Sequence, residues 1–215
     1  MLSGAVLLLS HQEGVWMNLT EAIQQLRSSE KRKFSQSFDL MVNLANIDLK
    51  KPENKFSKDV VLPHGRGKDV KIAIMSDTIK DAITKRDIEG MDKKEMKRLA
   101  REYEFFLAEA PLMPVVGKVM GRYLGPKGKM PKLLAPGRSP DSALNEAGNS
   151  VRVKVRDSPV VHVYVGSEGM ADKQVEENAM HVINEVRKSL PAKSRIRNVY
   201  IKLTMSKPVK IDTVF

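Results

Sequence analysis

Neither end of this chain carries enough secondary structure to close a hydrophobic core alone. Residues 17–66 predict one helix followed by two strands, and residues 152–215 predict two or three strands with one helix. A two-stranded hairpin is marginal in water until further strands or a helix cover its apolar face. The two segments are therefore expected to fold together as a two-layer α+β domain, into which residues 67–151 are inserted.

Apolar periodicity predicts the elements of these end segments. Apolar residues recur at helical spacing from Leu19 to Leu26, and they alternate with polar residues from Phe38 to Leu44, as in a half-buried strand. Val60–Leu62 is expected to pair with that strand. In the later segment, strands are expected at 151–155, 160–165 and 199–205, with an amphipathic helix that closes before Pro191.

The inserted block alternates short apolar runs with helical patterns. Strands are expected at 71–75 and 105–108, and helices at 81–88, 93–103 and 112–123. Alternation of buried strands with helices predicts βαβ units and an open α/β layer. Glycines and prolines are interspersed from Leu124 to Arg138, so this segment is expected to be turn and loop.

The charge distribution favours a polyanionic partner. The chain carries a formal net charge of +11, and its residues from Gly117 to Arg138 include cations but no carboxylate. Such a one-sided surface concentrates any polyanion through summed Coulomb attraction. Nucleic acid is the favoured partner, and a solvated basic loop is the alternative. Aromatic residues make up only 5% of the chain, which argues against a single-strand binder built on aromatic faces.

The sequence offers no catalytic or metal-binding constellation. The chain has no cysteine, and none of its 4 histidines has a partner four residues along a helix. Residues 128–131 read GKMP, without the hydroxyl of a P-loop, and Gly65-x-Gly67 precedes a strand rather than a helix. We therefore expect no cofactor and no enzymatic activity. A nucleotide-dependent enzyme using the inserted block and a non-specific nucleic-acid-binding protein are the alternatives.

Residues 1–16 are interpreted as an N-terminal extension. The apolar run Ala5–Leu9 is too short to span a bilayer and follows no basic residue, so neither a membrane partner nor an export signal is expected. Met17 is followed by Asn18 and Glu21, a pattern typical of a helix start. We hypothesise that Met17 is the native start.

The run from Gly117 to Pro131, GKVMGRYLGPKGKMP, resembles the signature of the L-one family of large-subunit ribosomal proteins, the family of the mobile ribosomal stalk. Most of the chain, from about Met17 onward, can be aligned with that family, in an archaeal-like form. The resemblance implies an RNA-binding α+β domain formed by residues 17–66 and 152–215. It also implies an inserted Rossmann-like three-layer α/β domain at 67–151, joined by two crossings that can act as a hinge.

The resemblance further implies a function. The protein is expected to be a structural component of the large ribosomal subunit in the cytoplasm, bound to 23S-type rRNA at the stalk. It is expected to assist release of deacylated tRNA from the exit site and to repress translation by binding its own mRNA. Outside the ribosome we expect a monomer.

The same resemblance implies an RNA-binding site of two polar strips. Lys33 would meet phosphate, Phe34 would pack on ribose or base, and Ser37, Thr204 and the backbone near Met205 would bond sugar hydroxyls, as for folded RNA. From the residues alone, a core Phe34 and a core-facing Met205 are the alternatives.

Other site residues follow from the resemblance less directly. Ser206 stands where the family usually has glycine, so its side chain is expected to crowd a backbone approach to RNA. Arg156 and Asp157 occupy a turn that the family also uses near RNA. In the inserted domain, the expected tRNA contacts are Lys127, Lys129 and Lys132.

Overall fold

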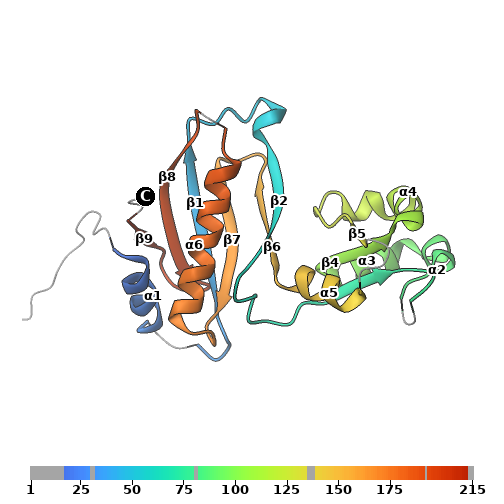
Figure 1. The fold of residues 1–215 in the computed structure, drawn as a ribbon, viewed down its shortest axis with the longest axis horizontal. Coiled ribbons are helices and arrows are strands. Elements are labelled where there is room, and N and C mark those ends of the chain that lie inside the picture. The colour runs from blue at the N-terminus through green and yellow to red at the C-terminus, as the bar shows by residue number, and fades with distance from the viewer. Residues whose placement is uncertain (1–16, 30–31, 80–81, 135–138, 192, 213–215) are drawn as a thin grey trace, which may run out of the picture. The chain divides into compact units, whose positions relative to one another are not determined.

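The computed structural model describes residues 17–29, 32–79, 82–134, 139–191 and 193–212 (Figure 1). The predicted extension at 1–16, and with it the hypothesis of a native start at Met17, lies outside the described residues. The chain divides into two compact units. We call them the terminal unit, formed by the chain up to Val60 and from Arg152 on, and the inserted unit, Val61–Val151.

The terminal unit is built on a four-stranded antiparallel sheet. Two helices pack against the sheet on one face (Figure 1). The sheet order is β7 (Val160–Ser167), β1 (Ser37–Ala45), β8 (Arg195–Leu203) and β9 (Val209–Ile211), and the helices are α1 (Leu19–Arg27) and α6 (Asp172–Ser189).

Burial confirms the alternation predicted for β1. Phe38, Leu40 and Val42 are fully buried and Leu44 nearly so, whereas the residues between them are half-exposed. The buried side chains face the helices, where α1 contributes Ile23. Because burying one such side chain stabilises a fold by about 1.5–3 kcal/mol, this face fixes the register of the strand.

Val60–Leu62 does not pair with β1, so that prediction was wrong. Val60 and Val61 belong to β2 (Phe56–Val61), which follows the 3-10 turn Pro52–Asn54 and pairs with β6 (Ser150–Val155) in a separate two-stranded sheet. β2 buries only Val60, whereas β7 and β8 each bury every second residue over several positions. Only strands with that pattern can extend the helix-covered face of β1.

The chain passes between the units within the β2–β6 sheet. It leaves the terminal unit between Val60 and Val61 and returns between Val151 and Arg152. The first boundary therefore lies earlier in the chain than the boundary after Arg66 that was predicted from the sequence. Since β2 and β6 are hydrogen-bonded neighbours, the two crossings run side by side.

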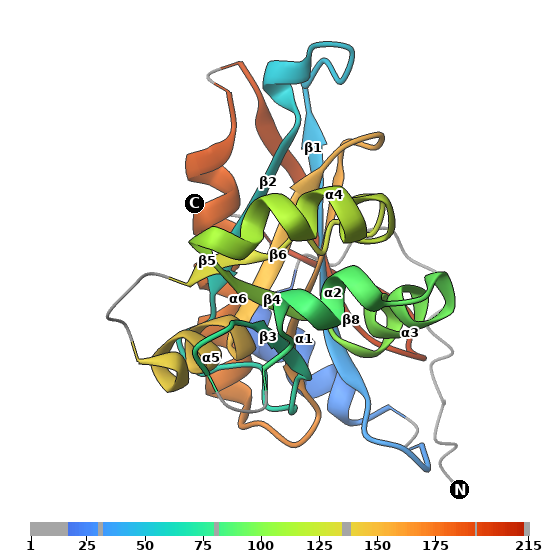
Figure 2. The same ribbon diagram turned by 90° about the vertical axis from the view of Figure 1, so that its right-hand side faces the viewer.

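The inserted unit is a parallel sheet covered by helices on both faces, in the α/β class that its sequence predicts (Figure 2). Phe106 and Ala108 of the middle strand pack on one side, and Phe105 and Leu107 pack in a separate core cluster on the other. The strands, in order, are β3 (Ile72–Met75), β4 (Phe105–Glu109) and β5 (Lys132–Leu134). The first core contains α2 (Lys85–Gly90), α3 (Lys93–Glu102), the 3-10 turn Ala110–Leu112 and α4 (Met113–Leu124), and the second contains α5 (Pro140–Gly148).

Part of the segment expected to be loop is a strand. β5 pairs in parallel with β4 and buries Leu134. Pro131 lies just outside β5, and Gly128 has a φ of 67° in the turn ahead of it. The loop prediction was wrong for residues 132–134, which contain neither glycine nor proline. Pro131 does not prevent the strand, because proline is tolerated immediately before one. Neither α5 nor β9 was anticipated.

Candidate nucleic-acid interface

The start of β1 and the end of β8 bring two polar segments together. The backbone amide of Ser37 donates to Thr204 Oγ1 at 3.1 Å, and that of Met205 donates to Gln36 Oε1 at 3.2 Å. Antiparallel pairing of Phe38 with Leu203 sets this register. Residues 33–37 and 204–206 therefore lie side by side, and we call them the polar strip.

The two large apolar side chains of the polar strip face solvent. Phe34 is 51% exposed and Met205 is 61% exposed. The alternative in which both belong to the core is therefore wrong. Lys33 and Thr204 are also exposed, while Ser37 is half-buried. This surface combines a cation, a flat ring, a thioether and hydroxyls, which together suit a sugar–phosphate ligand with exposed bases.

Gln36 supports the polar strip from its buried side, a role that was not predicted from the sequence. Its side chain is 3% exposed. Its backbone amide donates to Glu168 Oε2 at 2.9 Å, and the amide of Glu168 donates to the Gln36 carbonyl at 2.8 Å. The period of two contained the signal, since extending it backward from Phe38 places Gln36 on the buried side.

Arg27 connects the end of α1 to the loop between β7 and α6, which contains Glu168. Its guanidinium donates to the carbonyl of Glu168 at 2.6 Å and to that of Met170, and it forms an ion pair with Asp172. The guanidinium also lies 5.4 Å from the centroid of the Phe38 ring. These contacts fix the loop on which Gln36 depends.

Ser206 fits its turn without a glycine-like backbone. Its hydroxyl accepts from the amide of Leu203 at 2.8 Å and lies 3.2 Å from the carbonyls of Leu203 and Lys207. Within the part of the chain that the structure describes, Asn46 is the only non-glycine residue with positive φ. Whether Ser206 crowds RNA stays a prediction, but the turn itself does not require glycine.

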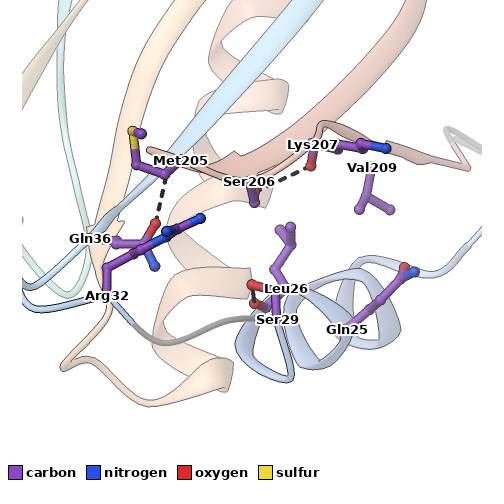
Figure 3. Close-up of a pocket in the computed structure, with 9 residues that line it drawn as sticks. All are labelled: Gln25, Leu26, Ser29, Arg32, Gln36, Met205, Ser206, Lys207 and Val209. Atoms are coloured by element: carbon purple, nitrogen blue, oxygen red, sulfur yellow. Dashed lines mark hydrogen bonds between the residues drawn. The ribbon is translucent and has the colours of Figure 1, made fainter.

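A pocket of about 390 Å³ opens beside the polar strip (Figure 3). It lies between the end of α1, the segment before β1 and the turn after β8. Its lining residues are Gln25, Leu26, Ser29, Arg32, Gln36, Met205, Ser206, Lys207 and Val209.

Arg156 and Asp157 do not join the polar strip. They lie in the exposed turn between β6 and β7, where the carbonyl of Pro159 accepts from the amide of Leu44 at 2.8 Å. That position is at the opposite end of β1 from Ser37. Since β1 has 9 residues and a strand rises about 3.4 Å per residue, the turn and the strip are separated by most of the sheet's length.

The lysines expected to contact tRNA already bond within the inserted unit. The Lys129 ammonium donates to the carbonyls of Ala100, at 3.2 Å, and Tyr103, at 2.8 Å, and the Lys127 ammonium donates to Ala100 at 3.0 Å. Both therefore bind carbonyls at the C-terminal end of α3, where cations are stabilised by the helix dipole. Lys132 lies 3.4 Å from Ser150 Oγ and 5.3 Å from the centroid of the Phe105 ring.

The carboxylate at the end of β4 is held by hydroxyl groups. Ser76 and Thr78 donate to Glu109 Oε1 at 2.6 and 2.5 Å, and these hydrogen bonds lower the pKa of Glu109. A lowered pKa makes this carboxylate a poor general base. In the described ranges, no group of three or more His, Cys, Asp or Glu side chains is placed to hold a metal ion. No described helix is long and apolar enough to cross a membrane.

Fold and surface together define a two-unit α/β protein with an exposed polar and aromatic strip suited to nucleic acid. The profile of the Ribosomal protein L1p/L10e family matches residues 26–207, and the chain belongs to that family. The chain is thus a ribosomal protein, and its recognition from the Gly117–Pro131 run is confirmed.

Curated relatives agree along nearly the whole chain. "Large ribosomal subunit protein uL1" of Pyrococcus horikoshii is 41% identical over 208 residues, which cover 90% of this chain and 95% of the relative. The protein of that name from Methanothermobacter thermautotrophicus is 41% identical over 207 residues, covering 90% and 98%. That from Thermoplasma volcanium is 38% identical over 205 residues, covering 90% and 94%. These relatives confirm the archaeal-like character.

Proposed function

We propose that this protein is a structural component of the large ribosomal subunit in the cytoplasm, where it binds rRNA of the mobile stalk through the polar strip. The observation that carries the proposal is the junction of β1 and β8, where Phe34, Met205 and Thr204 are exposed on one surface. The relatives' name supports the same assignment.

The hydrogen bonds within the polar strip leave it able to donate to ribose. Thr204 Oγ1 accepts from the Ser37 amide at 3.1 Å, while its distance to the Ser37 carbonyl is 3.5 Å. The hydroxyl proton can therefore turn to an RNA 2′-oxygen with little loss, since a 3.5 Å hydrogen bond is weak. Lys33 would neutralise phosphate and Phe34 would pack against ribose or base.

The inserted unit supplies the contact with deacylated tRNA in the exit site. Its basic surface includes Lys118 and Arg122 on α4, which are exposed, and Lys127 at the turn beyond. Lys129 and Lys132 are partly buried and engaged with neighbouring groups, so we assign them to the support of this surface. Lys127 serves both roles, because its ammonium is on the surface while it donates to Ala100.

The same polar strip would also bind the protein's own mRNA and so repress translation. A repressor of this kind needs one surface that accepts either RNA, because competition between rRNA and mRNA then sets the level of synthesis. Outside the ribosome the protein is proposed to be a monomer, which sedimentation at several concentrations would test.

Binding to a stalk rRNA fragment, compared with an unrelated hairpin at two salt concentrations, tests the proposal. A specific reader keeps its preference at high salt, because non-specific binding by phosphate neutralisation falls steeply with salt. We expect Thr204→Ala or Phe34→Ala to remove the preference. Equal binding of both RNAs, with dependence on the lysines alone, would instead identify a generic polyanion binder. A rise in unfolding temperature with ATP or NAD, and none with RNA, would favour the enzyme.

A further inference from the structure

The pocket beside the polar strip has the size and lining of a binding site. Its volume of about 390 Å³ lies within the range of about 300–1,000 Å³ that is common for ligand sites. Leu26 and Val209 contribute apolar side chains to the lining, and Ser29 and Ser206 contribute hydroxyl groups (Figure 3). None of its nine lining residues is a carboxylate.

Gln36 places a fixed hydrogen-bond donor at this pocket. Its side chain is 3% exposed, and Oε1 accepts the Met205 amide at 3.2 Å, so the nitrogen Nε2 must lie on the opposite side of the side-chain amide (Figure 3). Within the described ranges, no protein acceptor lies within hydrogen-bond distance of Nε2. Nε2 does not belong to the buried donors that lack a partner among the described residues, so solvent reaches it at the pocket. A ligand acceptor that enters the pocket can therefore replace water at this donor.

The charges around the pocket select the kind of ligand. Arg32 and Lys207 are exposed at its rim. A group that is flat and apolar on its faces, bears an acceptor on its edge and carries a negative charge outside the pocket matches this arrangement. A nucleobase with its attached phosphodiester has all three properties.

We propose that this pocket receives one unpaired nucleobase of the RNA bound at the polar strip. The inference rests on the proposed function and deepens it, because Gln36 and Met205 belong to both the strip and the pocket. An RNA held along the strip would need only one nucleotide turned out of its helix to fill the pocket. The bound RNA is then read by its unpaired nucleotide as well as by its sugar hydroxyls.

The geometry also restricts which base edge is read. A glutamine amide recognises adenine when both its oxygen and its nitrogen are available. Here Oε1 already accepts the Met205 amide, so the N–H groups of Nε2 are the first groups of Gln36 that a base can use. The base must therefore turn an acceptor, either a carbonyl oxygen or a ring nitrogen, toward Nε2.

Gln36→Glu tests the pocket without disrupting the polar strip. The substitution keeps an oxygen for the Met205 amide and replaces the donor by an oxygen, which repels a base acceptor. The matched control is Gln24→Glu, which adds the same charge at an exposed residue of α1 that does not line the pocket. Ser29→Leu fills the pocket from its wall and provides a second variant if Gln36→Glu unfolds.

The probe is a stalk rRNA fragment in which each unpaired nucleotide in turn is made abasic. At one position, we expect the abasic RNA to bind the wild type about tenfold more weakly than intact RNA, because a hydrogen bond and apolar contacts of the base are lost. For Gln36→Glu or Ser29→Leu, the same abasic RNA should bind less than about twofold more weakly than intact RNA, because changes at interacting groups are not additive. On intact RNA, Gln36→Glu should lose about tenfold in affinity, and Gln24→Glu less than about threefold.

The outcomes distinguish this inference from the proposed function. In one outcome, the wild type prefers the stalk RNA, but each abasic change lowers the RNA affinity of the wild type and of the pocket variants by the same factor. The proposed base pocket is then wrong, whereas RNA binding by the polar strip is still supported. A wild type that binds stalk RNA no better than an unrelated hairpin would overturn both.

Discussion

The amide of Ser37 donates to Thr204 Oγ1 at 3.1 Å, across 167 positions of sequence. This bond joins the first residue of β1 to the residue that follows β8. The bond joins residues 33–37 and 204–206 into one surface, and the proposed RNA contact requires both segments.

Thr204→Val is expected to weaken binding of the stalk RNA by about three- to tenfold, because it removes a hydroxyl that orders the strip and, in the proposed complex, donates to RNA. Titration with labelled RNA measures the loss. The matched control is Thr20→Val, which removes a hydrogen bond to Glu176 Oε1 of 3.0 Å in the same unit, outside the strip. Equal losses in the two variants would contradict a role of Thr204 at the RNA.

Phe34→Ala and Met205→Ala are expected to lower RNA affinity with little effect on the free energy of unfolding. Their side chains are 51% and 61% exposed, so little core is lost. Phe38→Ala provides the contrast, because Phe38 is fully buried and its removal should cost about 3–5 kcal/mol. Urea denaturation and RNA titration of each variant separate the two effects. A large loss of stability in Phe34→Ala would show that the ring packs inside the unit.

Lys129→Met is expected to destabilise the inserted unit by about 0.5–1 kcal/mol, because its ammonium no longer satisfies the carbonyls of Ala100 and Tyr103 at the end of α3. Lys118→Met should leave stability unchanged, since Lys118 is exposed on α4. Hydrogen exchange of α3 amides reports the change locally. Loss of tRNA binding in Lys118→Met but not in Lys129→Met would support the division between contact and support.

Stability at acid pH is expected to depend on Glu185. Lys58 and Lys188 bond its carboxylate at 2.6 and 2.9 Å and lower its pKa from 4.5 to about 2. Because the folded pKa is below the unfolded one, the contribution is complete above pH 4.5 and is lost as pH falls toward about 2. Glu185→Gln should cost about 0.5 kcal/mol at pH 7, since the lysines are largely exposed.

The measurement for this prediction is the urea midpoint between pH 2 and 7. The difference between wild type and Glu185→Gln should shrink as pH falls from 4.5 toward about 2. A difference that is constant over that interval would contradict the ion-pair origin. The other carboxylates with lowered pKa, such as Glu109, are present in both proteins and cancel in the comparison.

Local periodicity predicted most of the helices and strands, but not β5, α5 or β9, and it did not predict which strands pair. The alternation from Phe38 to Leu44 placed every buried residue of β1 correctly. It did not show that Val60 pairs elsewhere, because a strand's pattern defines the face that it buries and not the neighbour that it chooses.

For the candidate site too, the sequence predicted individual residues but not how they are brought together. The family motif named Phe34 and Thr204, whose adjacency depends on strand pairing far apart in sequence. The role of Lys129 could not be predicted from the sequence, because a lysine can bind either a ligand or the carbonyls at a helix end. Its hydrogen bond of 2.8 Å to the Tyr103 carbonyl indicates the second role. The burial of Gln36 was predictable, because the alternation of β1, extended backward from Phe38 by two residues, places Gln36 on the buried side.

The order of the strands has a consequence for biosynthesis. The inserted unit draws its contacts from residues 61–151, so it can fold while later residues are still being added. The polar strip forms later, because residues 204–206 follow β8 and Leu203 must first pair with Phe38. If the polar strip binds RNA as proposed, a nascent chain that ends before Thr204 lacks half of the binding surface, and RNA binding begins only after that residue has been added.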